Sequence, residues 1–190
     1  GELGPIYGAQ WRNFGGKHDL TVTNHISKDN NDGVDQIKNL IETLKTDPHS
    51  RRMIVSAWNP KELNNIALPS CHYSFQIYLR KDKYLDCKVN IRSNDLFLGA
   101  PFNIASYSLL VYMLAYLTGY SAGKLYYSIG DSHIYKNHID QVKLQLTRNL
   151  RVFPKLKIIG DVKNIEDFEF ENIELKGYNP HPHIKASMAV

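Results

Sequence analysis

Two cysteines, Cys71 and Cys87, stand in different sequence contexts. Cys87 occupies an inward position of an alternating apolar pattern, where a free cysteine usually packs as a small hydrophobic side chain. Cys71 follows Pro69-Ser70 and precedes His72 at a turn that leads into a strand. A thiol at the end of an element, beside a group that can carry positive charge, can be exposed and can ionise readily. The pattern therefore leaves two readings of Cys71 open, a nucleophile or a structural cysteine.

Two basic clusters could bind an oxyanion such as a phosphate. Arg92-Ser93-Asn94-Asp95 comes directly after a strand; its guanidinium and hydroxyl can hold a phosphate, and its carboxylate can accept from a ring N–H. Ser50-Arg51-Arg52 is a second possible clamp. Either cluster taken alone more often belongs to a solvated run of charged residues.

Other polar side chains follow strands or open helices. Asn103 either caps a helix or offers a donor and an acceptor to the edge of a base. His133 and Tyr135 follow a strand and could bind a sugar hydroxyl or brace a loop. His181 and His183 lack the cysteines or carboxylates that zinc requires, so we expect no metal site. Neither a P-loop nor a G-x-G-x-x-G motif is present, so any nucleotide is held without a glycine cradle.

The elements that must position these groups follow from hydrophobic spacing. The apolar stretch that ends before Gly119 is apolar almost all round, so we expect this helix to be buried centrally. Strands and helices mix without strict alternation, which predicts an α+β fold. We expect helices at 34–44, 103–118 and 139–146, strands at 51–58, 73–79, 85–91 and 125–129, and short strands near 156 and 168.

Composition limits the class of protein. The 190 residues are 43% hydrophobic and 22% charged, which predicts one globular domain and excludes a disordered tail, a collagen-like fibre or a coiled coil. A net charge of +4 suits an anionic small molecule and is too small to indicate DNA binding. The longest apolar run, 104–117, is shorter than the ~20 residues that a bilayer requires, so we expect no membrane span. Two cysteines provide no disulfide framework, so we expect an intracellular, cytoplasmic protein.

Taken together, these stretches resemble the thymidylate synthase family in order along nearly the whole chain. The run from Phe97 to Tyr107 is the most specific. The matching stretches are Gly4-Pro5-Ile6-Tyr7-Gly8 with Gln10-Trp11-Arg12, Ser50-Arg51-Arg52, Ser56-Ala57-Trp58-Asn59, Leu68-Pro69-Ser70-Cys71-His72, Arg92-Ser93-Asn94-Asp95, 97–107, Gly130-Asp131-Ser132-His133-Ile134-Tyr135, Gly177-Tyr178-Asn179-Pro180-His181-Pro182 and Met188-Ala189-Val190.

The resemblance implies a fold and a reaction. The fold is a mixed twisted β-sheet packed against a buried central helix, with the sheets of two subunits back to back in a homodimer. The reaction is the reductive methylation of dUMP to dTMP, in which 5,10-methylenetetrahydrofolate, as co-substrate, supplies carbon and hydride and leaves as dihydrofolate. The resemblance implies no metal, no membrane and no specific DNA binding.

The resemblance also implies residue roles. Cys71 would be the nucleophile that adds to the pyrimidine C6, Asn103 would bind the N3–O4 edge, and Tyr7 would belong to the water network that removes the C5 proton. Asp95 would fix the folate pterin and so counts among the catalytic residues. The implied substrate-binding residues are Arg92, Ser93, Asn94, Asp95, Asn103, His133 and Tyr135, with Arg51 and Arg52 reaching from the partner subunit. The implied folate-binding residues are Asp95, Leu98, Gly99, Phe102 and Ala189.

Departures from the family pattern leave alternatives open. Ser70 stands where the family usually has Pro, and Ile91 stands where it has Gln before Arg92. Residues 1–190 would form the catalytic domain without the family's N-terminal segment. That segment would either belong to a longer protein, such as a fusion with dihydrofolate reductase, or have been lost, and this chain alone could then be inactive. A dUMP or dCMP hydroxymethylase and a non-catalytic nucleotide- or RNA-binding relic are the two alternative functions; Asn103 argues against the cytosine-specific hydroxymethylase.

Overall fold

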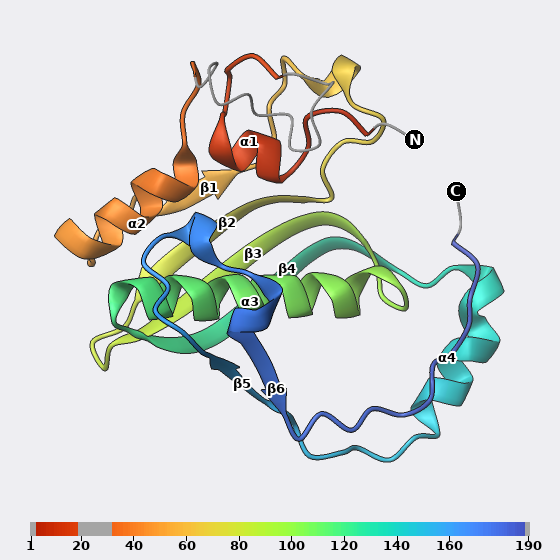
Figure 1. The fold of residues 1–190 in the computed structure, drawn as a ribbon. Coiled ribbons are helices and arrows are strands. Elements are labelled where there is room, and N and C mark those ends of the chain that lie inside the picture. Colours follow the sequence, from red (N-terminus) through yellow and green to blue (C-terminus); the bar gives the residue numbers. More distant parts are fainter. Residues whose placement is uncertain (1–2, 19–31, 189–190) are drawn as a thin grey trace.

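The structure is a computed structural model that describes residues 3–18 and 32–188 (Figure 1). The helices and strands are α1 (Gly8–Arg12), α2 (Gln36–Thr46), β1 (Ile54–Ser56), β2 (His72–Leu79), β3 (Tyr84–Asp95), α3 (Gly99–Thr118), β4 (Ser121–His133), α4 (Ile139–Leu146), β5 (Lys155–Ile158) and β6 (Ile173–Lys176). Short 3₁₀ turns are η1 (Leu63–Asn65), η2 (Lys136–His138), η3 (Ile165–Asp167) and η4 (Phe170–Asn172).

A mixed sheet forms the centre of the fold. Its strand order is β1-β2-β3-β4, and β5 and β6 form a separate antiparallel pair. The first three strands are antiparallel, whereas β3 and β4 run parallel because α3 carries the chain back between them. The expected α+β fold with a mixed sheet and a central helix is confirmed, and Figure 1 shows the strands curving over α3.

The hydrophobic core lies between the sheet and two helices. Alternate side chains of β2 and β3, with Val55 of β1, meet the apolar stripe of α2 and one side of α3. Cys87 is completely buried in this layer, as its inward position predicted. The fully buried side chains include Phe75, Ile77, Leu85, Val89 and Leu114.

Local signals explain how two of the helices begin and end. Asp35 caps α2, and its carboxylate accepts from the backbone N–H of Lys38 at 2.9 Å. Gly119 ends α3 in the left-handed conformation, with φ 73°, that glycine adopts without steric cost. α3 begins four residues earlier than the spacing predicts, at Gly99. A strand at 168 is wrong, because Phe168 lies between η3 and η4 and the strand begins at Ile173.

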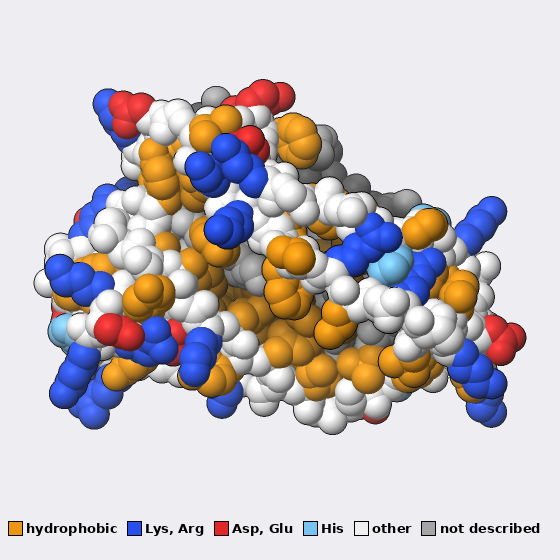
Figure 2. Space-filling model, turned by 90° about the horizontal axis from the view of Figure 1, so that it is seen from below, with side chains coloured by type: hydrophobic (Ala, Val, Ile, Leu, Met, Phe, Trp, Pro, Cys, Tyr) orange, Lys and Arg blue, Asp and Glu red, His pale blue; other side chains and the backbone are white. Residues whose placement is uncertain are grey.

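The expectation that α3 is buried on every side is wrong for the described residues. Tyr107, Val111 and Leu114 are buried against the sheet, but Tyr112 and Tyr116, which face away from them, are 40% and 39% exposed. β5 and η3 also contact α3, but far less extensively than β3 and β4 do, and the exposure of these tyrosines shows that this side is not covered. Figure 2 shows hydrophobic side chains around a hollow in the surface seen from below.

α3 is also the one helix, within residues 3–18 and 32–188, that is long and apolar enough to cross a membrane by length and composition alone. It has 20 residues and a mean hydropathy of 1.3. One side of α3 packs on β3 and β4 in the core, and 28% of its apolar stretch is buried.

Candidate active site

The carboxyl end of β3 brings most of the predicted site residues together. Cys71 precedes β2, which pairs with β3, while the ends of β3 and β4 lie side by side because the two strands are parallel. Each of the last four residues of β3 lies next to a different polar or thiol-bearing residue of the candidate site. Arg92 approaches Cys71, Ser93 approaches Asp131, Asn94 bonds to Asn103, and Asp95 pairs with His133.

Cys71 is held by its backbone and left half-buried. Its N–H donates to the hydroxyl of Tyr7 at 3.0 Å, and its carbonyl accepts from the N–H of Arg92 at 2.8 Å. The thiol is free and lies 3.8 Å from Nη2 of Arg92. The sulfur of Cys71 therefore has a guanidinium as its polar neighbour, in a position open enough for an electrophile to approach.

Arg92 is fixed by the loop that carries the thiol. Its Nη2 donates to the carbonyl of Pro69 at 2.7 Å, and its Nε donates to the carbonyl of Ser70 at 3.1 Å. Ser70 is buried, and its hydroxyl lies 3.5 Å from the carbonyl of Ala57. The serine that replaces the family's proline thus finds a polar partner inside the fold.

Tyr7 reaches the site from α1 in an uncommon backbone conformation. Its backbone φ is 42°, a value that residues other than glycine rarely adopt. The ring stacks on His72 with centroids 4.0 Å apart, and burial raises the pKa of the Tyr7 hydroxyl. The stack and the hydrogen bond to Cys71 are the contacts that offset the strained backbone.

The half-buried His72 and the buried Tyr107 form a pair behind Cys71. Nδ1 of His72 lies 2.8 Å from the hydroxyl of Tyr107, whose pKa is raised by burial. Burial lowers the pKa of His72 to about 4, so the ring is neutral at neutral pH, and one hydrogen bond joins its Nδ1 to the hydroxyl of Tyr107. The cation beside Cys71 is therefore Arg92, and the sequence-based idea that His72 supplies the charge is wrong.

An amide pair connects β3 to α3. Nδ2 of Asn94 donates to Oδ1 of Asn103 at 3.0 Å. The hydroxyl of Tyr127, on β4, donates to Oδ1 of Asn94 at 3.0 Å and lies 3.4 Å from Oδ1 of Asn103. Asn94 is 4% exposed, whereas Asn103 is half-buried and remains accessible.

Asp131 connects two of the predicted substrate-binding residues. Its Oδ2 lies 3.4 Å from the hydroxyl of Ser93 and 3.1 Å from Nδ1 of His133. The ring of Tyr135 meets the ring of His133 edge-on with centroids 5.0 Å apart. Ser93, His133 and Tyr135 therefore lie together at the ends of the parallel strands.

The predicted folate-binding residues lie around the start of α3. Asp95 accepts from the N–H of Phe97 at 2.9 Å, which turns the chain out of β3 and into the helix. Leu98 and Gly99 are half-buried, and the ring of Phe102 is 74% exposed, which leaves an apolar surface beside Asn103. Ala189 lies outside the described residues.

The segment just before the C-terminus is anchored by His138, a completely buried side chain that the sequence patterns did not single out. Its Nε2 donates to the carbonyl of Ser187 at 2.7 Å. The ring also packs on Phe97 and Tyr135, with centroids 5.5 and 5.7 Å apart. This contact holds the end of the described chain next to the loop that leads into α3.

Arg51 and Arg52 lie far from Cys71 within one chain. Both are exposed and precede β1, whose Ile54 pairs with Gln76 of β2. Continuing this register places them beside the last residues of β2, at the end opposite to Cys71 and roughly 25 Å from it at the usual rise per residue of a strand. The described chain does not bring these two arginines to the rest of the candidate site.

Sequence reasoning gave no role to Tyr107, Tyr127, Asp131 and His138. Tyr107 and Asp131 lie in stretches that the family resemblance includes, and a role could have been sought there. Tyr127 and His138 carry no local signal, because their partners come from distant parts of the chain. Ile91, the second departure from the family pattern, is buried opposite His72 and completes the apolar core. Within the described residues, no three His, Cys, Asp or Glu side chains are grouped to hold a metal ion.

Comparison with known proteins identifies a family with this chain's motifs. The family model described as thymidylate synthase matches residues 1–190. Over all 190 residues the chain is 48% identical to the thymidylate synthase of Varicella-zoster virus (strain Dumas), 52% to that of Malacoplasma penetrans (strain HF-2) and 48% to that of Homo sapiens. It covers 62%, 60% and 59% of those proteins, so the chain spans about three fifths of their length.

Proposed function

The chain belongs to the thymidylate synthase family, and from that premise we propose that the full-length protein converts dUMP to dTMP. 5,10-Methylenetetrahydrofolate is the co-substrate that supplies the carbon and the hydride. The observation that carries this proposal is the cluster at the end of β3, where a thiol, a guanidinium, an amide and a hydroxyl meet. Each of these groups matches one chemical requirement of the reaction.

The first requirement is a nucleophile for C6 of the pyrimidine. C5 of uracil reacts poorly with an electrophilic carbon until a thiolate adds at C6 and leaves an enolate. The thiol of Cys71 is half-buried and lies 3.8 Å from the guanidinium of Arg92. Cys71 is therefore the residue we assign to the covalent bond.

The second requirement is stabilisation of the charge that develops on O4. Asn103 is accessible and supplies an amide at the edge of the site, which can donate to O4 of uracil. Tyr7 supplies a hydroxyl beside the backbone of Cys71, close to where the C5 proton leaves. We assign base recognition to Asn103 and participation in proton removal to Tyr7.

The third requirement is binding of the rest of the nucleotide. Arg92 and Ser93 are the cation and the hydroxyl at the end of β3 that suit a phosphate. His133 and Tyr135 lie beside them on the parallel strand and suit a sugar hydroxyl. The folate would lie against Asp95, Leu98, Gly99 and Phe102, whose exposed ring offers a flat surface to a pterin.

Homodimerisation completes this proposal. Arg51 and Arg52 are remote from Cys71 of their own chain, so they serve phosphate binding only if a second subunit presents them. Complementation tests this arrangement with two inactive full-length variants, Cys71→Ser and the double variant Arg51→Ala/Arg52→Ala. If arginines act across the interface, each mixed dimer has one intact site, and an equal mixture regains roughly a quarter of wild-type activity. No regain of activity in dimers shown to have exchanged subunits rejects the cross-subunit assignment.

Turnover is tested by release of tritium from 5-³H-dUMP, with 5,10-methylenetetrahydrofolate and the full-length protein. We expect release by the wild type and none above background by Cys71→Ser. Mass spectrometry of the product distinguishes a methyl from a hydroxymethyl group, and so separates this function from a hydroxymethylase. A folded full-length protein that releases no tritium is instead the result expected of a nucleotide-binding relic.

We also propose that the protein acts in the cytoplasm. Both of its cysteines are free thiols, and a reducing compartment keeps a nucleophilic thiol such as Cys71 available. Fractionation of cells that express the full-length protein tests this, and recovery in an oxidising compartment would contradict it.

A further inference from the structure

Three polar side chains behind the candidate site form one directed chain of hydrogen bonds. Tyr127 donates to Oδ1 of Asn94 at 3.0 Å, and Nδ2 of Asn94 donates to Oδ1 of Asn103 at 3.0 Å. Burial raises the pKa of Tyr127, so its phenol keeps the proton that it donates. Asn94 is almost fully buried and uses both ends of its amide on protein partners.

The direction of this chain determines which end of Asn103 faces outward. Rotating the Asn103 amide by half a turn would set its Nδ2 against Nδ2 of Asn94, and two donors do not bond. Oδ1 of Asn103 is therefore kept on Asn94, and no residue in the described parts of the chain accepts from its Nδ2. Asn103 presents a donor to whatever binds beside it.

We infer that Asn94 is a positioning residue that makes the site select uracil over cytosine by fixing the amide of Asn103. This inference rests on the proposed function and adds a specificity role at a position that does not itself reach the base. Uracil carries a carbonyl at C4 and an N–H at N3, whereas cytosine carries an amino group and an acceptor. The fixed Nδ2 of Asn103 matches the uracil carbonyl and opposes the cytosine amino group, and the N3–H of uracil would replace the longer, 3.4 Å contact from Tyr127.

The substitution Asn94→Asp reverses the chain at its middle position. A carboxylate can only accept hydrogen bonds. One oxygen of the carboxylate at position 94 would accept from the hydroxyl of Tyr127, and the other would accept from Nδ2 of Asn103. Asn103 then presents Oδ1 outward, which suits the amino group of cytosine. Asn94→Leu, which keeps the branching at Cγ and has no polar group, removes the bias without reversing it.

The experiment measures the dissociation constants of dUMP and dCMP for the full-length protein by calorimetry. We expect the wild type to bind dUMP more tightly than dCMP. Asn94→Asp should lower the ratio of the dCMP dissociation constant to the dUMP dissociation constant by about tenfold or more, because one buried hydrogen bond is then mispaired with dUMP. Asn94→Leu should lower the same ratio several-fold. A merely structural role for Asn94 would weaken both nucleotides equally and leave the ratio unchanged.

Asn90→Asp is the matched control, because it makes the same substitution on the same strand at a side chain that bonds to Ser74 instead. It should leave the ratio unchanged. A folded Asn94→Asp protein with the wild-type ratio overturns the inference. If Asn94→Asp does not fold, Asn94→Leu and Tyr127→Phe decide, and an unchanged ratio in both overturns it. A wild-type protein that binds neither nucleotide rejects the proposed function, and the inference with it.

Discussion

The hydroxyl of Tyr7 accepts a hydrogen bond from the backbone N–H of Cys71, 64 residues further along the chain. Tyr7 directly precedes α1, and Cys71 directly precedes β2. This hydrogen bond therefore connects the start of the first helix to the start of the strand that follows the candidate nucleophile. The position of the thiol therefore depends on the segment around Tyr7 as well as on β2.

Tyr7→Phe removes this acceptor and leaves the Cys71 N–H without a partner. We expect a loss of about 1–2 kcal/mol in the free energy of unfolding, because the bond is shielded from water. We also expect at least a tenfold loss of tritium release, because the hydroxyl is also assigned to proton removal. Urea unfolding and the tritium assay measure the two effects. Tyr78→Phe on β2, whose side chain is exposed, is the control and should change neither.

The two cysteines should differ sharply in reactivity. Burial raises the pKa of Cys87 to about 12, whereas the thiol of Cys71 is accessible beside Arg92. Iodoacetamide should alkylate Cys71 in the native protein and Cys87 only after unfolding. Peptide mass spectrometry at intervals measures both rates, and dUMP should protect Cys71. Equal rates in the native protein would show that the burial of Cys87 is wrong.

The half-buried His72 should make stability depend on pH in the acid range. Burial lowers its pKa from 6.5 to about 4, so protons bind the unfolded chain more readily than the folded one. Its stabilising contribution is complete above pH 6.5 and is lost as the pH falls towards 4. His72→Asn keeps a hydrogen-bond partner for Tyr107 but does not titrate in this range. As the pH falls from 6.5 towards 4, the free energy of unfolding should decrease less steeply in this variant than in the wild type. The difference in slope should reach up to about 1.4 kcal/mol per pH unit.

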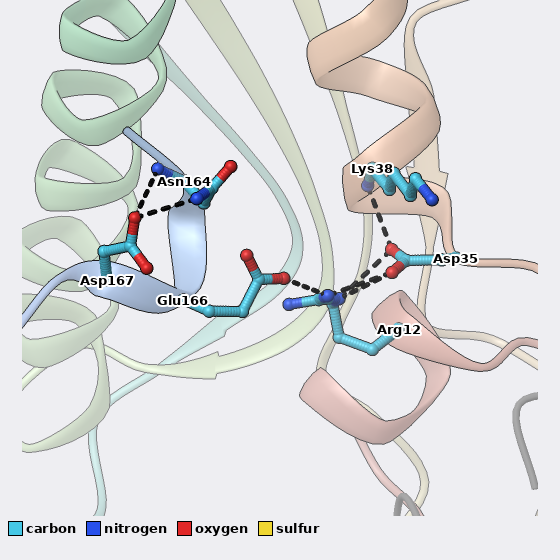
Figure 3. A network of polar contacts seen from close by, with 6 residues as sticks. All are labelled: Arg12, Asp35, Lys38, Asn164, Glu166 and Asp167. Carbon is cyan, nitrogen blue, oxygen red and sulfur yellow. Dashed lines mark hydrogen bonds and ion pairs between the residues drawn. The ribbon is translucent and has the colours of Figure 1, made fainter. Parts of the chain in front are cut away.

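An ion-pair network ties α1 to α2 and η3 (Figure 3). Arg12 bonds to both carboxylate oxygens of Asp35 and also pairs with Glu166. Asp35 is largely buried and also caps α2, whereas Glu166 is half exposed. Arg12→Met should therefore cost about 1–2 kcal/mol, and Glu166→Gln less than about 0.5 kcal/mol.

Urea unfolding at low and high salt measures both costs, and only the Glu166 contribution should decrease strongly with salt. Lys176→Met is the matched control, because it breaks an exposed pair with Glu174 and should have almost no effect. A cost for Arg12→Met as small as that of the control would contradict a stabilising role for this network.

Local sequence signals predicted much of the fold. The glycine at the end of α3 and the inward position of Cys87 are each determined by a few neighbouring residues, and both are confirmed. The helix expected at 34–44 begins two residues later, at Gln36, because Asp35 is its cap. The full length of β4 was not predicted, because Gly123 and Gly130 interrupt its apolar alternation. Parallel pairing with β3 also supplies hydrogen bonds that no local pattern reveals.

Predicting the site from individual residues was limited by distance along the chain. The context of Cys71 alone did not decide between nucleophile and structural cysteine, and only the resemblance of many separate motifs brought it together with Arg92 and Asn103. The family resemblance supplied the members of the site but not their mutual geometry. That Asn94 turns inward to Asn103 and Tyr127 depends on three elements packing together, which only the structure describes.

The parallel pairing of β3 and β4 also links the site to the order of folding. A hairpin such as β2–β3 can close early because its strands adjoin in sequence, but β4 joins only after the whole α3 crossover has returned along the sheet. Nucleotide-binding competence is thus expected to be among the last properties acquired by a newly made chain. Recovery of dUMP binding during refolding would consequently report complete assembly rather than collapse.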